Sequence, residues 1–188
     1  MRGFIRLQEA ARAAKRNSAA GFTLVEVLVT SVILAVLVTA LFLVLNLGQS
    51  SWTNADTGIQ LRQEIARALM FMSQELKQTS AAKIDLTLNS SAGSISFRIP
   101  QDPDGDGYVV DASGNIDWSP EINYSLNSSG QVLREYGGVT SIIANNISSL
   151  AFTRILSEVL QIDLTASRVS NTGVTLRDAD QIIVKLRN

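Results

Sequence analysis

The residues whose types and spacing could do chemistry lie in one acidic stretch, residues 102–111 (DPDGDGYVVD). Aspartates that alternate along a tight turn bring several carboxylate oxygens together, and calcium is a hard cation that prefers such ligands. Gly107 would permit the sharp backbone turn that this convergence needs. The predicted ligands are Asp102, Asp104, Asp106 and Asp111, with the Tyr108 backbone carbonyl.

This acidic stretch resembles the first half of an EF-hand calcium loop. The twelfth position of such a loop is normally a bidentate glutamate, and here it is Ser113, for which Asp111 or the more distant Asp117 would have to substitute. The alternative is a solvated acidic turn, because Asp, Gly and Pro are common turn formers. Calcium is thus the one cofactor that we expect, with a structural role in ordering the loop after Pro100.

The sequence has few residues that could support other kinds of chemistry. The chain has no cysteine, which excludes disulfides, thiolate zinc sites and cysteine nucleophiles, and no histidine, the usual general base near neutral pH. A catalytic metal held by the aspartates is the remaining enzymatic alternative, but no nucleophile–base pair or phosphate loop accompanies it. No cluster of basic and aromatic residues indicates a nucleic-acid surface. We therefore expect a chain that is not an enzyme.

The strongest element in the sequence is the apolar run from Phe22 to Leu47, in which Glu26 is the only charged residue. As a helix, this run would extend about 39 Å at about 1.5 Å per residue, which exceeds the ~30 Å hydrocarbon core of a bilayer. A buried core helix is the alternative, but a domain this small seldom encloses so long an apolar segment. The run predicts a transmembrane helix over residues 22–47.

Charges on the two sides of this helix predict its orientation. Residues 1–21 hold five basic residues and one acidic residue, and no charge follows the run until Asp56. The positive-inside rule places the N-terminus in the cytoplasm and the C-terminal domain outside the membrane. A secretory signal fits poorly because the small residues 18–21 precede the apolar run instead of following it.

The stretch Gly21–Glu26 (GFTLVE) resembles the type IV prepilin processing motif. The resemblance implies that a membrane aspartyl peptidase cuts after Gly21, that residues 1–21 are a leader, and that Phe22 is then methylated on its new amine. Glu26 becomes the fifth mature residue and acts in assembly. The expected partners are prepilin peptidase, other pilin or pseudopilin subunits, membrane lipid and the assembly platform of the bacterial inner membrane.

Glu26 also has a physical role to fill. A carboxylate in hydrocarbon costs a few kcal/mol or more unless it is paired. In a stack of subunits, Glu26 of one chain could lie beside the cationic Phe22 amine of its neighbour, which would offset the desolvation of both groups. A pair within one chain is the alternative, since four residues make about one helical turn. The resemblance favours the pair between chains.

Beyond the apolar run, residues 48–80 predict an amphipathic continuation of the helix. Ile65, Leu69, Met72 and Leu76 would form one apolar stripe. Gly48 and residues 54–58 weaken the helical pattern, so we expect a bend or a short break there.

From Lys83 the apolar period changes to two, which predicts strands. The alternating apolar sets are Ile95, Phe97 and Ile99; Ile122, Tyr124 and Leu126; Leu160, Ile162 and Leu164; and Ile182, Val184 and Leu186. Residues 127–130 predict a hairpin turn, and residues 170–173 predict a loop between two late strands. The segment 141–149 (SIIANNISS) is ambiguous. Residues 81–188 are therefore expected to form a β-rich extracytoplasmic domain.

A long N-terminal helix packed on an antiparallel sheet is an α+β, pilin-like architecture. The C-terminal part resembles minor pseudopilins of type II secretion and minor pilins, through residues 62–76, the 124–135 hairpin and residues 150–152. Many major pilins carry a proline within the transmembrane helix and a C-terminal disulfide, and this chain has neither. The expected function is a structural subunit, minor in kind, of a type IV pilus or a pseudopilus.

The alternative function is a signal-anchored extracytoplasmic binding protein that keeps its N-terminus uncleaved, and a calcium-dependent binding protein is one form of this alternative. The anchor is shared by systems for secretion, DNA uptake, motility and adhesion, so the sequence does not distinguish among them.

Overall fold

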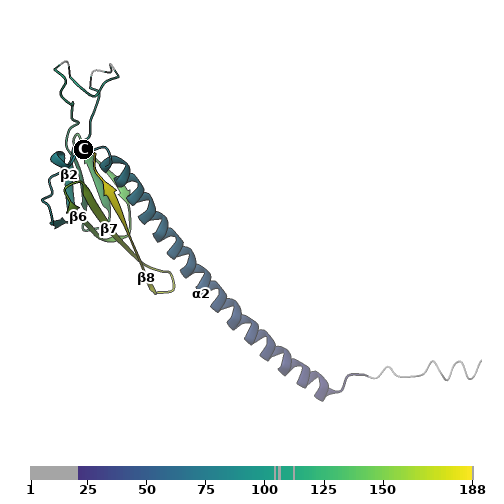
Figure 1. The fold of residues 1–188 in the computed structure, drawn as a ribbon. Helices are drawn as coiled ribbons and strands as arrows, with labels where there is room; N and C mark the ends of the chain where they lie inside the picture. The colour runs from purple at the N-terminus through teal and green to yellow at the C-terminus, as the bar shows by residue number, and fades with distance from the viewer. Residues whose placement is uncertain (1–20, 104, 106, 112, 188) are drawn as a thin grey trace, which may run out of the picture. The chain divides into compact units, whose positions relative to one another are not determined.

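The computed structural model describes residues 21–103, 105, 107–111 and 113–187. The chain divides into two compact units, Met1–Gly48 and Gln49–Asn188. Figure 1 shows the chain as a ribbon coloured from the N-terminus to the C-terminus.

One helix, α2 (Leu24–Leu76), accounts for 53 residues. The break expected near Gly48 and residues 54–58 is not present, because α2 continues through both. A glycine inside a helix costs only about 1 kcal/mol relative to alanine, which the neighbouring helical residues can offset.

In the first unit, polar side chains of α2 bond to its own backbone. Thr30 donates to the carbonyl of Glu26 at 2.8 Å, and Thr39 and Asn46 likewise donate to carbonyls one turn earlier. Each of these side chains therefore has a hydrogen-bond partner within its own helix, inside an apolar segment.

In the second unit, α2 buries one stripe of apolar side chains. The fully or nearly fully buried members are Leu61, Ile65, Ala68, Leu69, Met72 and Leu76. Their spacing matches one face of a helix, so the amphipathic pattern expected from the sequence is confirmed.

The second unit also holds two four-stranded antiparallel sheets, where a single sheet was expected. The first has the order β1 (Ser91–Ala92), β6 (Ile147–Leu156), β7 (Val159–Val169) and β8 (Thr175–Lys185). The second has the order β2 (Ser94–Phe97), β3 (Ile122–Leu126), β4 (Val132–Tyr136) and β5 (Val139–Ala144). A short 3-10 helix, η1 (Ala81–Lys83), follows α2. The α+β, pilin-like class is confirmed.

The ambiguous segment 141–149 proves to be the crossing between the two sheets. It contains the end of β5 and the start of β6, with Asn145 and Asn146 between them. Asn146 has a φ of 60°, a left-handed conformation that asparagine adopts more readily than most residues. This reversal lets the chain end β5 in one sheet and begin β6 in the other.

Apolar residues from both sheets and from α2 form one core. Most of the alternating residues singled out in the sequence are buried, with Phe97, Tyr124, Ile162 and Val184 each at most 1% exposed. The others, Ile99, Leu126 and Ile182, are partly buried and pack against the core. The hairpin at residues 127–130 joins β3 to β4, and residues 170–173 lie between β7 and β8. Both turn predictions are confirmed. Figure 1 shows β6, β7 and β8 beside the second half of α2.

Candidate processing and assembly site

The residues around the predicted cut precede the helix. Gly21, Phe22 and Thr23 are outside any helix or strand, and α2 begins at Leu24. Phe22 is 78% exposed. A Cβ placed on Gly21 would meet no atom within 4 Å. Contacts within the described chain therefore do not require glycine at this position.

Thr23 occupies the N-cap of α2. Its Oγ1 accepts a hydrogen bond from the backbone N–H of Glu26 at 3.2 Å, and its carbonyl accepts one from the N–H of Val27 at 3.1 Å. The side chain thus satisfies one of the helix N–H groups that have no partner in the preceding turn. Since Thr23 lies after the predicted cut, this cap would stay with the mature chain.

Glu26 lies in the first turn of α2 and is exposed. A carboxylate in this position interacts favourably with the positive end of the helix dipole. Its pairing with the Phe22 amine of a neighbouring chain needs a cleaved N-terminus and a second subunit. The assembly role of Glu26, the cut at Gly21 and the methylation of Phe22 therefore stay predictions at this point.

Among the described residues, α2 is the one helix long and apolar enough to cross a membrane, judged by length and composition. Its most apolar window of 18 residues has a mean hydropathy of 2.9, and none of that window is buried. This part of α2 is therefore not a buried core helix of the chain, the alternative that the sequence left open.

The acidic loop is described in part. Asp104 and Asp106, two of the predicted calcium ligands, lie outside the described residues. The carboxylate of Asp102 accepts hydrogen bonds from the N–H groups of Gly105 and Gly107, at 2.8 and 2.9 Å. Gly107 has a φ of 87°, as the sharp turn expected there requires.

Asp111 closes a turn of its own. Its Oδ1 accepts the N–H groups of Ser113 and Asn115, each at 2.8 Å. Hydrogen bonds from the backbone and side chain of Asn115 lower the pKa of the Asp111 carboxyl, because they stabilise its charged form. Tyr108 is exposed. Within the described part of the chain, no three acidic, histidine or cysteine residues are grouped to hold a metal, and the calcium site stays a prediction.

A polar cluster that the sequence did not predict joins α2 to the second sheet. Arg134 on β4 donates to Glu75 of α2 at 2.8 Å, and the Tyr124 hydroxyl on β3 donates to the same carboxylate at 2.5 Å. Burial, followed by the hydrogen bond to Glu75, raises the pKa of Tyr124, and the bond to Glu75 raises the pKa of Arg134. The inward position of Tyr124 in its strand was the available signal, but its partner comes from a helix 49 residues earlier.

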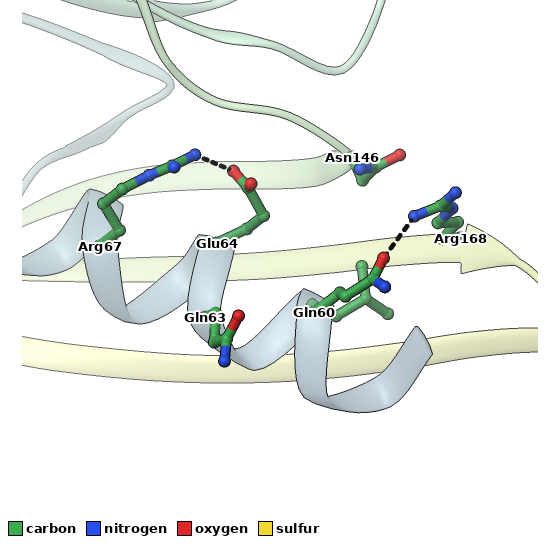
Figure 2. Close-up of a pocket in the computed structure, with 7 residues that line it drawn as sticks. Gln60, Gln63, Glu64, Arg67, Asn146 and Arg168 are labelled. Atoms are coloured by element: carbon green, nitrogen blue, oxygen red, sulfur yellow. Dashed lines mark hydrogen bonds and ion pairs between the residues drawn. The ribbon is translucent and has the colours of Figure 1, made fainter. Parts of the chain in front are cut away.

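A cavity of about 540 Å³ lies in the second unit (Figure 2). Figure 2 shows Arg67 pointing toward Glu64, at 2.6 Å, and Arg168 pointing toward Gln60, at 2.9 Å. Glu64 also accepts the backbone N–H of Asn145. These charged and polar groups satisfy one another, so the cavity walls present a hydrogen-bonded helix–sheet contact and no nucleophile–base arrangement.

Comparison with known proteins finds a likeness at the N-terminus. Residues 16–42 match the family of the prokaryotic N-terminal methylation motif. No curated protein and no solved structure matches the chain. The matched residues include the predicted cut, the Thr23 cap and the first turns of α2. The motif and the long apolar helix after it support a membrane-anchored, type IV pilin-like precursor.

Proposed function

We propose that the chain is a structural subunit of a type IV pilus or a type II secretion pseudopilus, minor in kind, that assembles through its N-terminal helix. The observation that carries the proposal is the methylation motif of residues 16–42, which leads directly into an exposed apolar helix. The motif implies processing by prepilin peptidase and assembly with other pilin subunits.

Processing prepares the N-terminus for assembly. Hydrolysis of the Gly21–Phe22 bond adds water across it, which leaves a carboxylate on the leader and a cationic amine on Phe22. Methylation of that amine keeps its charge. In the fibre, Glu26 of one subunit pairs with the Phe22 amine of its neighbour, and this pairing sets the axial register of the stack.

The apolar part of α2 occupies two environments in turn, the membrane and the fibre. Before assembly it lies in the bacterial inner membrane as a single span, with the basic leader in the cytoplasm and the second unit outside. The assembly platform then extracts the subunit, and helices of neighbouring subunits replace the lipid. In both environments the exposed apolar surface of residues 24–47 is covered.

A minor role is supported by two departures from the major-pilin pattern. No proline interrupts residues 22–47, and no cysteine is available for a C-terminal disulfide. A structural, non-enzymatic role agrees with the structural character of the pilin-like family to which the motif points.

Mass spectrometry of the mature chain tests the proposal. The full-length precursor is produced in a bacterium with a prepilin peptidase, and the N-terminus of the purified protein is determined. We expect N-methylated Phe22. A retained Met1 would support the uncleaved signal-anchored binding protein instead.

A Gly21→Ala variant is the matched control. Because an alanine Cβ at Gly21 would contact nothing within 4 Å, the variant should insert normally. We expect it to keep its leader, and the loss of processing then reports on the residue at the cut and not on misfolding.

A further inference from the structure

Thr23 lies between the first residue of α2, Leu24, and the predicted cut after Gly21. We infer that Thr23 is a positioning residue for processing: by capping α2, it holds the Gly21–Phe22 peptide bond outside the helix, where a peptidase can reach it. This inference rests on the proposed processing and adds a residue that acts on the conformation of the substrate.

Helix geometry shows what the cap replaces. In an α-helix the N–H of residue i bonds to the carbonyl of residue i−4, so the N–H of Glu26 would bond to the carbonyl of Phe22. In the structure, Thr23 Oγ1 accepts that N–H at 3.2 Å instead. Because the N–H of Glu26 already has this partner, extending the helix to Phe22 would gain no hydrogen bond for it.

The helical hydrogen bond one residue earlier would involve the peptide bond that is cut. If α2 extended toward the N-terminus, the N–H of Val25 would bond to the carbonyl of Gly21. That carbonyl belongs to the bond that the peptidase hydrolyses. Its attack by an activated water requires an accessible carbonyl carbon, and a helical bond would hold the group against the helix wall. The extended helix is therefore a poor substrate.

An apolar surrounding strengthens the tendency to extend. Unsatisfied N–H groups are more costly in lipid than in water, so an uncapped α2 would gain partners by adding residues at its start. Gly21 opposes this extension because glycine is a poor helix former. Gly21 and Thr23, on either side of Phe22, thus both oppose extension of the helix toward the N-terminus.

The test compares Thr23 variants as full-length precursors, in detergent or vesicles, with purified prepilin peptidase. Thr23→Val keeps the shape of the side chain and removes the acceptor. Thr23→Ser and Thr23→Asn change the shape and keep an acceptor. If the uncapped chain spends most of its time with an extended helix, the KM of Thr23→Val should rise about fivefold with kcat unchanged, and Ser and Asn should restore it.

Thr30→Val is the matched control. The Thr30 hydroxyl bonds to backbone carbonyls inside the helix, those of Glu26 and Val27. Its removal is the same chemical change, two turns from the scissile bond, and should leave KM and kcat unchanged.

Hydrogen exchange gives a readout that does not depend on the peptidase. In Thr23→Val, exchange of the Val25 amide should slow, because the extended helix gives that N–H a carbonyl partner. Faster exchange at Val25 would mean that the helix frays instead, and would overturn the inference.

The kinetic outcomes separate the possibilities. Cleavage of Thr23→Val with wild-type kinetics would overturn the role of the cap. Cleavage of Thr23→Asn as slow as that of Thr23→Val would show that the peptidase reads the threonine itself, and would overturn it too. A wild-type precursor that is not cut after Gly21 would refute the proposed function, and this inference with it.

Discussion

Arg134 on β4 and Glu75 on α2 form a paired contact in which Nε and Nη2 of the arginine both donate to the carboxylate, at 2.8–3.1 Å. Both side chains are largely buried, with 18% and 15% of their surface exposed. The Tyr124 hydroxyl donates to the same carboxylate. This pair fixes the end of α2 against the second sheet.

Removing one partner of this pair should be costly. Arg134→Met leaves the Glu75 carboxylate in a largely buried site without its cation, and we expect the free energy of unfolding to fall by about 2–4 kcal/mol. Thermal or chemical unfolding of the full-length chain in detergent measures the change. Arg62→Met is the control, because the Arg62–Asp178 pair is exposed and should contribute less than about 1 kcal/mol. Equal losses in the two variants would contradict the prediction.

High pH should weaken the fold through Tyr124. Its pKa is raised in the folded chain, so the phenol binds its proton more tightly there than in the unfolded chain, where the ordinary value is 10.0. The resulting stability is complete below pH 10 and is lost progressively as the pH rises above it. Unfolding midpoints measured between pH 9 and pH 11 (roughly one unit on each side of that ordinary value) would show the decline.

The Tyr124→Phe variant gives the control for this pH dependence. It removes the titrating hydroxyl, and the decline above pH 10 should become shallower. An unchanged profile would mean that another group causes it.

The turn between β3 and β4 should tolerate no side chain at Gly130. The residue has a φ of 72°, and a Cβ would lie 2.9 Å from the carbonyl oxygen of Ile147. Gly130→Ala should destabilise the chain by about 1–3 kcal/mol, from backbone strain and from the shift that the contact forces. Gly138→Ala separates the two causes, since Gly138 has a φ of 79° and open space. It should cost less, and an equal cost would remove the contact from the explanation.

Glu26 should matter for assembly and not for cutting. Glu26→Gln keeps the size of the side chain and removes the charge that would pair with the Phe22 amine. Its leader should be removed largely as in the wild type, while incorporation into fibres should fall strongly. N-terminal mass spectrometry and the amount of chain in sheared fibres give the two readouts. Normal incorporation would exclude Glu26 from the assembly mechanism.

Calcium should bind the loop of residues 102–111 if the predicted ligand set is correct. Calorimetric titration of the purified chain should then release or absorb heat, and the melting temperature should rise with calcium. Asp102→Asn should reduce both effects. Neither heat nor a shift in the wild type would reject the site.

The sequence predicted the parts of the fold that depend on local periodicity. The stripe of Ile65, Leu69 and Met72 and the alternation of Ile122 and Tyr124 were found as expected, because burial on one face leaves a repeating pattern. The division into two sheets was not predicted. It depends on the reversal at Asn145 and Asn146, in a segment of mixed polar and apolar residues whose periodicity is ambiguous.

The sequence indicated the candidate site through a local motif, and the roles of its residues stay predictions. Gly21, Phe22 and Glu26 are adjacent in sequence, and their spacing alone indicated the motif that residues 16–42 match. The cap made by Thr23 needed coordinates, since a threonine before a helix bonds to the backbone only in one local geometry. The Glu75–Arg134 pair joins residues 59 apart, and neither periodicity nor spacing could connect them.

The back-bonded side chains of Thr30, Thr39 and Asn46 have a consequence for the energy of changing surroundings. Each keeps its hydrogen bond to a carbonyl of its own helix, so none depends on water, lipid or another chain for a partner. Passage of this segment from one apolar medium to another would break none of these bonds. These three side chains therefore add nothing to the cost of the transfer, which depends on the apolar surface and on the pairing of Glu26.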